Sequence, residues 1–259
     1  MAELTDRQSE LKRRFTEERG YWAEFWDGLL ALDPDFFEAY LQFSTVPWKN
    51  GHLEPKIKEL IYIAIDAATT HLYEPGLRIH LQNAFKYGAT KEEVMEVYEL
   101  TSVLGLHTMT MGVPVMLEEL KAATGETVGG GELTERQADL KRRFIEGRGY
   151  WAEFWDGLLA LDPDFFEAYL QFSTVPWKNG HLEPKIKEFI YIAIDAATTH
   201  LYEPGLRIHL QNAFKYGATK EEVMEVYELV SVLGLHTMTM GVPVMLEELA
   251  AFEDGGQAR

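Results

Sequence analysis

Apolar residues in the first half of the chain recur every three or four positions, which is the period of one face of an α-helix. The longest such stretch begins at Pro55 and ends near Thr70, and its apolar side chains cover most of the helix surface. A helix of that kind is typical of the centre of a helical domain. The segment 61–65 could form a strand in isolation, but Ala67 and Ala68, which follow it, favour a helix. Because no other segment alternates convincingly between apolar and polar residues, the pattern predicts an all-α fold.

Local start and stop signals divide this half of the chain into separate helices. The segments 5–8 and 90–93 carry the sequence pattern of a capping box, which opens a helix. Asp33 is an N-cap followed by proline at the first helical position, and Gly20 and Gly88 are of the kind that ends a helix. We therefore expect helices over residues 5–19, 21–31, 34–43, 55–70, 75–87, 90–104 and 114–122, with a loop at 44–54 and a break at Gly112 and Pro114.

The second half of the chain repeats the first. A shift of 129 positions superimposes Glu3–Leu120 on Glu132–Leu249. Seven aligned pairs differ, and they are Asp6/Glu135, Ser9/Ala138, Glu10/Asp139, Thr16/Ile145, Glu18/Gly147, Leu60/Phe189 and Thr101/Val230. A repeat of this length is a domain, so we expect two near-identical helical domains, 1–122 and 132–259, joined by a glycine-rich linker at 123–131. Gene duplication or fusion of this kind makes a homodimer-like pair covalent, and we expect a pseudo-twofold relation between the copies.

Charge and composition exclude several classes of partner and chemistry. The net charge of -18 would repel nucleic-acid phosphates and anionic lipids, so we expect neither nucleic acid nor a membrane as a partner. The chain contains no cysteine, which excludes disulfides, thiolate metal sites and thiol catalysis. We find no signal peptide at the N-terminus and no apolar run approaching the roughly 20 residues of a membrane span. These features predict a soluble, cytoplasmic protein.

All eight histidines belong to the repeat: His52, His71, His80 and His107, followed by His181, His200, His209 and His236. Several lie near predicted helix ends and near carboxylates, and Glu59 and Asp66 are two turns apart on one face of the central helix. Where such helix ends meet, imidazoles and carboxylates could act as acid, base and clamp in a pocket. Arg78 could hold a substrate carboxylate through two hydrogen bonds.

Two other interpretations use the same residues. The set His71, Glu74, His80 and His107, with its counterpart His200, Glu203, His209 and His236, offers ligands suited to zinc, iron or copper, although its spacing matches no standard motif. A divalent metal is therefore possible. In a purely structural interpretation, His52 is solvated, while His71 and His107 bond helix carbonyls. The chain would then be a non-catalytic assembly module.

The ordered segments that carry a resemblance are Pro55–Ala68, Glu74–His80 and Gly88–Val94, together with the earlier Trp26 and Leu32–Phe36, and they occur twice. In this combination the chain resembles the carboxymuconolactone decarboxylase family, which includes alkylhydroperoxidase D-like proteins. The resemblance covers nearly all of each copy. It implies an all-helical fold, assembly of single-domain members into trimers or hexamers, and a pocket histidine at His80 and His209.

The peroxidase branch of that family carries two cysteines before its histidine. Tyr73 and Gly76 stand at those positions here, so the chain lacks the thiol chemistry of that branch. The resemblance instead implies a decarboxylase that needs no cofactor and acts on a small carboxylated lactone or keto acid. Loss of CO2 would leave an enolate-like carbanion, and His80 would protonate it.

The resemblance and the residue chemistry together give a set of candidate site residues. The predicted catalytic residues are His80, Glu74 and His107, with His209, Glu203 and His236 in the second copy. The predicted substrate-binding residues are Arg78, Glu59 and His71, with Arg207, Glu188 and His200. If single-domain relatives form hexamers, as the resemblance implies, three tandem chains would supply the same six domains, so we expect a homo-oligomer of three tandem chains.

Overall fold

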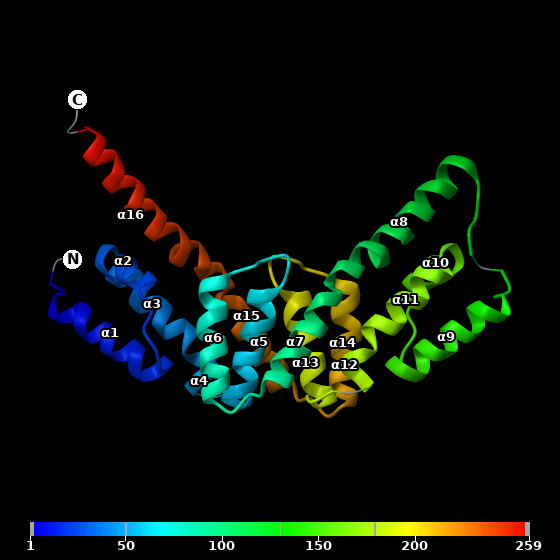
Figure 1. Cartoon of the computed structure of the whole chain (residues 1–259), viewed down its shortest axis with the longest axis horizontal. Helices are drawn as coiled ribbons and strands as arrows, with labels where there is room; N and C mark the ends of the chain where they lie inside the picture. The colour runs from blue at the N-terminus through cyan, green and yellow to red at the C-terminus, as the bar shows by residue number, and fades with distance from the viewer. Residues whose placement is uncertain (1–2, 50, 130, 179, 257–259) are drawn as a thin grey trace.

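The computed structural model describes residues 3–49, 51–129, 131–178 and 180–256, and every element assigned within these ranges is a helix. The all-α prediction is confirmed (Figure 1). The first copy contains α1 (Asp6–Arg19), α2 (Phe25–Leu32), α3 (Pro34–Ser44), α4 (Val46–Lys49), α5 (Pro55–Ala67), α6 (Glu74–Lys86), α7 (Lys91–Thr101), the 3₁₀ helix η1 (Ser102–Leu106) and α8 (His107–Thr124). The second contains α9 (Glu135–Arg148), α10 (Phe154–Leu161), α11 (Pro163–Ser173), α12 (Val175–Lys178), α13 (Pro184–Ala196), α14 (Glu203–Lys215), α15 (Lys220–Ser231), η2 (Val232–Leu235) and α16 (His236–Gly256).

The predicted helix starts follow from side-chain caps. Thr5 and Thr90 each accept a hydrogen bond from the backbone three residues later and complete a reciprocal capping box. The Asp33 carboxylate accepts a 2.9 Å hydrogen bond from the Phe36 amide and caps α3. Gly20 ends α1 with a φ of 79°, a conformation in which glycine has no steric penalty. These boundaries are therefore fixed by local interactions.

Other boundaries differ from the prediction. Residues 21–24 precede α2 without being helical, and a short helix, α4, lies within the predicted loop. Helix α8 begins at His107 and continues through Gly112 and Pro114, where the sequence predicted a break. Proline removes one backbone hydrogen bond from a helix. Packing of α8 along α10 supports the helix on both sides of that position, so tertiary contact overrides the local signal.

The two copies share the central hydrophobic cluster of the molecule. Helices α5 and α13 pack against each other and against α7 and α15 at the centre of the molecule (Figure 1). Ile61, Ile63 and their counterparts Ile190 and Ile192 have no exposed surface and belong to one buried cluster. This central cluster spans both copies, so neither central helix is covered by its own copy alone.

Each copy's last long helix crosses to the other copy. Helix α16 packs along α2, and α8 packs along α10, so the two outer arms of the molecule each combine both copies (Figure 1). Glycine makes the close approach possible: a Cβ at Gly28 would lie 2.9 Å from a Val242 methyl, and one at Gly157 would lie 2.7 Å from a Leu117 methyl. Because α8 and α16 are exchanged in this way, each places residues of its own copy among the helices of the other copy.

Buried ion pairs also join the copies. Lys58 Nζ lies 2.8 Å from Glu225 Oε1, and Lys187 Nζ lies 2.8 Å from Glu96 Oε1. All four side chains are almost fully buried. Because an unpaired buried charge is costly, each ion pair favours the one arrangement of the two copies in which both of its charges are paired.

Two helical runs, Lys91–Thr124 and Lys220–Phe252, are long and apolar enough to cross a membrane by length and composition. This corrects the expectation that no apolar run reaches such a length. The outer parts of both runs are α8 and α16, which pack along helices of the other copy. Core helices of soluble proteins meet the same criterion, so length and composition alone do not establish a membrane span.

Candidate functional site

Two matching cavities lie where the exchanged helices meet the other copy. The first has a volume of about 30 Å³ and is bounded by α1, α2, α3, α5 and α6 of the first copy and by η2 and α16 of the second. The second has the same volume, with the roles of the copies reversed. Each cavity therefore contains residues from both halves of the chain. The second cavity repeats the first with the two copies exchanged.

His80, on α6, is buried in the wall of the first cavity. Its Nδ1 forms a 2.6 Å hydrogen bond with Glu59 Oε2, and its ring stacks on Tyr62 at 4.3 Å between centroids. Glu59 Oε1 also accepts a 3.2 Å hydrogen bond from Asn83 Nδ2. These contacts fix the imidazole so that Nε2 faces Asp66, whose Oδ2 is 4.0 Å away.

Asp66 lies near the end of α5 and is 1% exposed. Its Oδ2 has no hydrogen-bond partner among the described residues. Burial raises the pKa of this carboxyl to about 7, and Glu59 acts in the same direction while His80 opposes the shift. A Cβ at Gly76 would lie 2.4 Å from Oδ2, so glycine is required beside the carboxyl group. The result is a buried acidic group that exchanges its proton near neutral pH.

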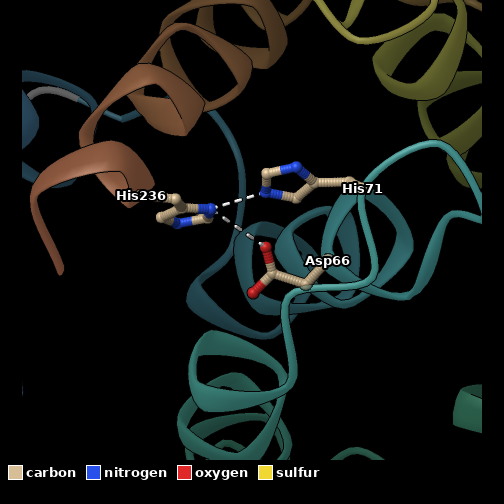
Figure 2. Close-up of side chains that lie close together, drawn as sticks. All are labelled: Asp66, His71 and His236. Atoms are coloured by element: carbon tan, nitrogen blue, oxygen red, sulfur yellow. Dashed lines mark hydrogen bonds and ion pairs between the residues drawn. The ribbon is translucent and has the colours of Figure 1, made fainter. Parts of the chain in front are cut away.

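His71 and His236 meet beside Asp66 although they are far apart in the sequence. His71 Nε2 is 2.6 Å from His236 Nδ1, and the same His236 nitrogen is 3.8 Å from Asp66 Oδ1 (Figure 2). Burial lowers the pKa of His236 to about 3, with His71 and His80 adding to the effect, and burial also lowers the pKa of His71. Both imidazoles are therefore neutral at physiological pH.

The ring of His236 is held in place by its neighbours. It stacks on Tyr73 at 3.8 Å between centroids, and the Tyr73 hydroxyl is hydrogen-bonded to Thr239. In the second cavity, His107 Nδ1 is 2.6 Å from His200 Nε2 and 3.7 Å from Asp195 Oδ1. The arrangement is thus the same in both halves.

Arg19 supplies a buried positive charge in the first cavity. It lies in the last turn of α1, is 6% exposed, and donates a 2.7 Å hydrogen bond from Nη1 to the Ser44 carbonyl. Its guanidinium lies 5.0 Å from the centre of the Trp48 ring, and its Nε has no partner among the described residues. Arg148 has the same place in the second cavity. A buried guanidinium with a free donor can bind an anion.

The structure separates some predicted site residues from the cavity. Glu74 and Arg78 are exposed and pair with each other on the surface, as do Glu203 and Arg207. Successive residues of an α-helix are about 100° apart around its axis. Arg78, two residues before His80, and Glu74, six residues before it, therefore lie on other faces of α6 than His80. The predicted within-copy grouping of Glu74 with His71, His80 and His107 therefore does not occur.

The remaining predicted residues are divided between the two cavities. His80 lines the first cavity, and Glu59 and His71 are hydrogen-bonded to the lining residues His80 and His236. His209 lines the second, where Glu188 and His200 make the same contacts with His209 and His107. His107 and His236 each belong to the cavity of the opposite copy. Sequence reasoning missed Arg19 because it has the form of an ordinary basic residue in a last helical turn. It also missed Tyr73, although that residue stands at a cysteine position of the peroxidase branch, and Thr239, for which the sequence holds no local signal.

Comparison with known proteins connects this geometry to a family. The family model described as "Carboxymuconolactone decarboxylase family" matches residues 34–123 and 163–252. A crystal structure from Burkholderia xenovorans LB400, provisionally assigned as a gamma-carboxymuconolactone decarboxylase subunit, is 48% identical to the chain. The match covers 94% of this chain and 98% of that one, with a TM-score of 0.90. No curated protein sequence matches.

Proposed function

Because the chain belongs to the carboxymuconolactone decarboxylase family, we propose that it is a decarboxylase, or a related lyase or isomerase, of a small carboxylated lactone or keto acid. The observation that carries the proposal is a single cavity containing both the buried Arg19 guanidinium and the imidazole of His80. One group suits an anionic substrate and the other suits proton transfer.

In the proposed reaction, Arg19 binds a carboxylate that the substrate retains. The bond to the departing carboxylate breaks, CO2 leaves, and the electron pair is delocalised into the lactone or keto carbonyl. His80, protonated on both nitrogens, donates Nδ1–H to Glu59 and transfers its Nε2 proton to the carbanion. Because the substrate carbonyl accepts the electrons, the step needs no cofactor, in keeping with a family that is generally cofactor-free.

The cavity must widen to admit such a substrate, because 30 Å³ accommodates only water-sized groups. Its walls come from several helices, among them α2 and α16, which belong to different copies. We propose that these two helices separate on binding and close over the substrate, which would exclude water from the carbanion.

CO2 release tests the reaction. A panel of small carboxylated lactones and keto acids is incubated with the wild type and with a variant carrying His80→Ala and His209→Ala. We expect CO2 from at least one compound, deuterium in the product when the reaction is run in D2O, and a rate lower by about 10²–10⁴-fold in the variant. His52→Ala with His181→Ala, in the exposed loops, is the matched control and should retain the wild-type rate.

Absence of CO2 release across the panel, with no detectable binding of the compounds, would contradict the proposal and favour a non-catalytic assembly module. A wild-type rate in the variant that lacks His80 and His209 would show that these two histidines are not the proton donors.

We also propose that three tandem chains associate, giving six domains, and that the assembly works in the cytoplasm without nucleic-acid or membrane partners. Large apolar side chains support the association. Phe36 and Phe43 on α3, with Phe165 and Phe172 on α11, are 42–53% exposed and line two apolar grooves. The lack of cysteine and the net charge of -18 support the location and the absence of those partners.

A further inference from the structure

The proposed reaction leaves unused one cluster of ligating atoms, in which Asp66 is buried and two histidines are partly buried. We propose that Asp66, His71 and His236 bind one divalent transition-metal ion of the zinc and iron class where the two copies meet. Asp195, His200 and His107 would bind a second ion in the same way. This inference rests on the arrangement of these side chains and is independent of the decarboxylase proposal.

The three ligand atoms converge on one point. One oxygen or nitrogen from each residue lies within 4.8 Å of the other two. Figure 2 shows His236 Nδ1 facing both His71 Nε2 and Asp66 Oδ1. One N–H can form the hydrogen bond between the two imidazoles, but the Asp66 carboxylate then receives no hydrogen bond from either ring. With metal–nitrogen bonds of about 2.0–2.1 Å, tetrahedral ligation needs the two imidazole nitrogens to separate by only about 0.7 Å.

The Asp66 carboxylate lacks a hydrogen-bond donor at its Oδ2 among the described residues, and His80 Nε2 is 4.0 Å from that oxygen. Asp66 is 1% exposed, and its Oδ2 has no hydrogen bond; in the second site both oxygens of Asp195 have none. A buried carboxylate without a donor is unfavourable, whereas coordination to a cation compensates it.

The surrounding residues hold the ligands as metal sites require. Stacking on Tyr73 fixes the His236 ring. The Tyr73 amide donates a 2.9 Å hydrogen bond to the Asp66 carbonyl, closing a turn that contains His71. Within that turn Leu72 has a φ of 52°, which is strained for leucine and is tolerated where the surroundings impose it. Such supporting contacts set ligand orientation and metal affinity.

Ligand chemistry narrows the class of ion. Two imidazole nitrogens and one carboxylate oxygen suit zinc, iron and related metals, whereas magnesium and calcium prefer oxygen ligands. Three protein ligands leave at least one coordination position open. His236 and Tyr73 line the cavity, so a small anionic or carbonyl ligand in the cavity could occupy that position.

Zinc stoichiometry tests both the site and its assembly from two copies. The untagged full-length protein is stripped with chelator, titrated with Zn²⁺ by calorimetry, and assayed by elemental analysis after dialysis. We expect two ions per chain in the wild type. His71→Ala with His236→Ala removes ligands from one site and should leave one ion. His71→Ala with His107→Ala removes one ligand from each site and should leave none.

These two variants carry the same number and type of substitutions, so a general effect of losing histidine would change them equally. His52→Ala with His181→Ala is the control that should keep two ions. If a variant does not fold, as judged by circular dichroism and gel filtration, Asp66→Asn with Asp195→Asn replaces it and should weaken Zn²⁺ binding at least tenfold at both sites.

Wild-type protein that binds no Zn²⁺ above background would overturn the proposal, as would equal stoichiometry in the two histidine variants. Both measurements are made without substrate. A failed metal site is therefore distinguishable from a failed decarboxylase, which the CO2 assay reports separately.

Discussion

At the residue scale, the Asp66 carboxyl group lies in surroundings that favour its neutral form. Its pKa rises from 3.8 to about 7 on folding, so the folded protein binds more protons than the unfolded chain between these values. The free energy of unfolding therefore falls as the pH rises through that window. Above about pH 7 the carboxyl group is ionised, and its full destabilising effect on the folded protein is present. His236, with a pKa lowered to about 3, has the opposite effect: its contribution declines as the pH falls below 6.5.

Replacing the Asp66 and Asp195 carboxylates measures their contribution to the pH dependence of stability. We expect the metal-free variant Asp66→Asn with Asp195→Asn to be more stable than the metal-free wild type at pH 8. The difference should reach up to about 4 kcal/mol per site, at about 1.4 kcal/mol per pKa unit, and should vanish near pH 4. Urea unfolding over this pH range, with chelator present, measures it. Asp35→Asn with Asp164→Asn, which changes exposed carboxylates paired with arginine, should produce no such gain. A loss of stability at pH 8 in the Asp66 variant would refute the expectation.

At the scale of elements, the crossing of α2 and α16 determines the shape of the first cavity. Helix α16 carries His236 and Thr239 into the wall that α2 covers, and Gly28 allows the two helices to approach closely. Helix α8 makes the equivalent crossing with α10 despite Pro114. The positions of His236 and Thr239 in the first cavity, and of His107 and Thr110 in the second, therefore depend on helix packing between the copies.

A side chain at Gly28 should force the crossing apart. We expect Gly28→Val to lower stability by about 1–3 kcal/mol through overpacking and to weaken ligand binding at the first cavity alone. Gly112→Ala in α8 is the matched control, because no atom lies within 4 Å of its added Cβ. It should raise stability by up to about 1 kcal/mol through better helix propensity. Thermal unfolding compares them, and unchanged stability in Gly28→Val would contradict the close packing.

At the scale of the whole molecule, the two copies behave as a covalent pair with a shared core. Buried ion pairs such as Lys58 with Glu225 join the copies, and each exchanged helix completes the other copy's cavity. The linker passes from α8 to α9 over residues that are largely exposed. Its contribution is to keep the copies at a high effective concentration, while the contacts themselves hold them together.

Cutting the linker should therefore leave the molecule intact. We expect a protease site inserted after Val128 to yield two fragments that stay together under native conditions with both cavities preserved. If three chains associate as proposed, native mass spectrometry should give three times 29.6 kDa, about 89 kDa, before and after cleavage. Fragments that separate on gel filtration would show that the linker holds the copies together, and a mass of one chain would contradict the trimer.

The sequence by itself determined the all-α class, the repeat, the capped helix boundaries and the family, because each depends on local patterns or on comparing one segment with another. Local patterns misplaced the break at Pro114 and grouped Glu74 with His80. Tertiary structure alone decided that Arg19 enters the cavity and that His71 meets His236 rather than His107. The physical reason lies in the repeat: His107 and His236 have the same sequence surroundings, so no local signal distinguishes contact within a copy from contact between copies. Only the packing of the exchanged helices makes that choice.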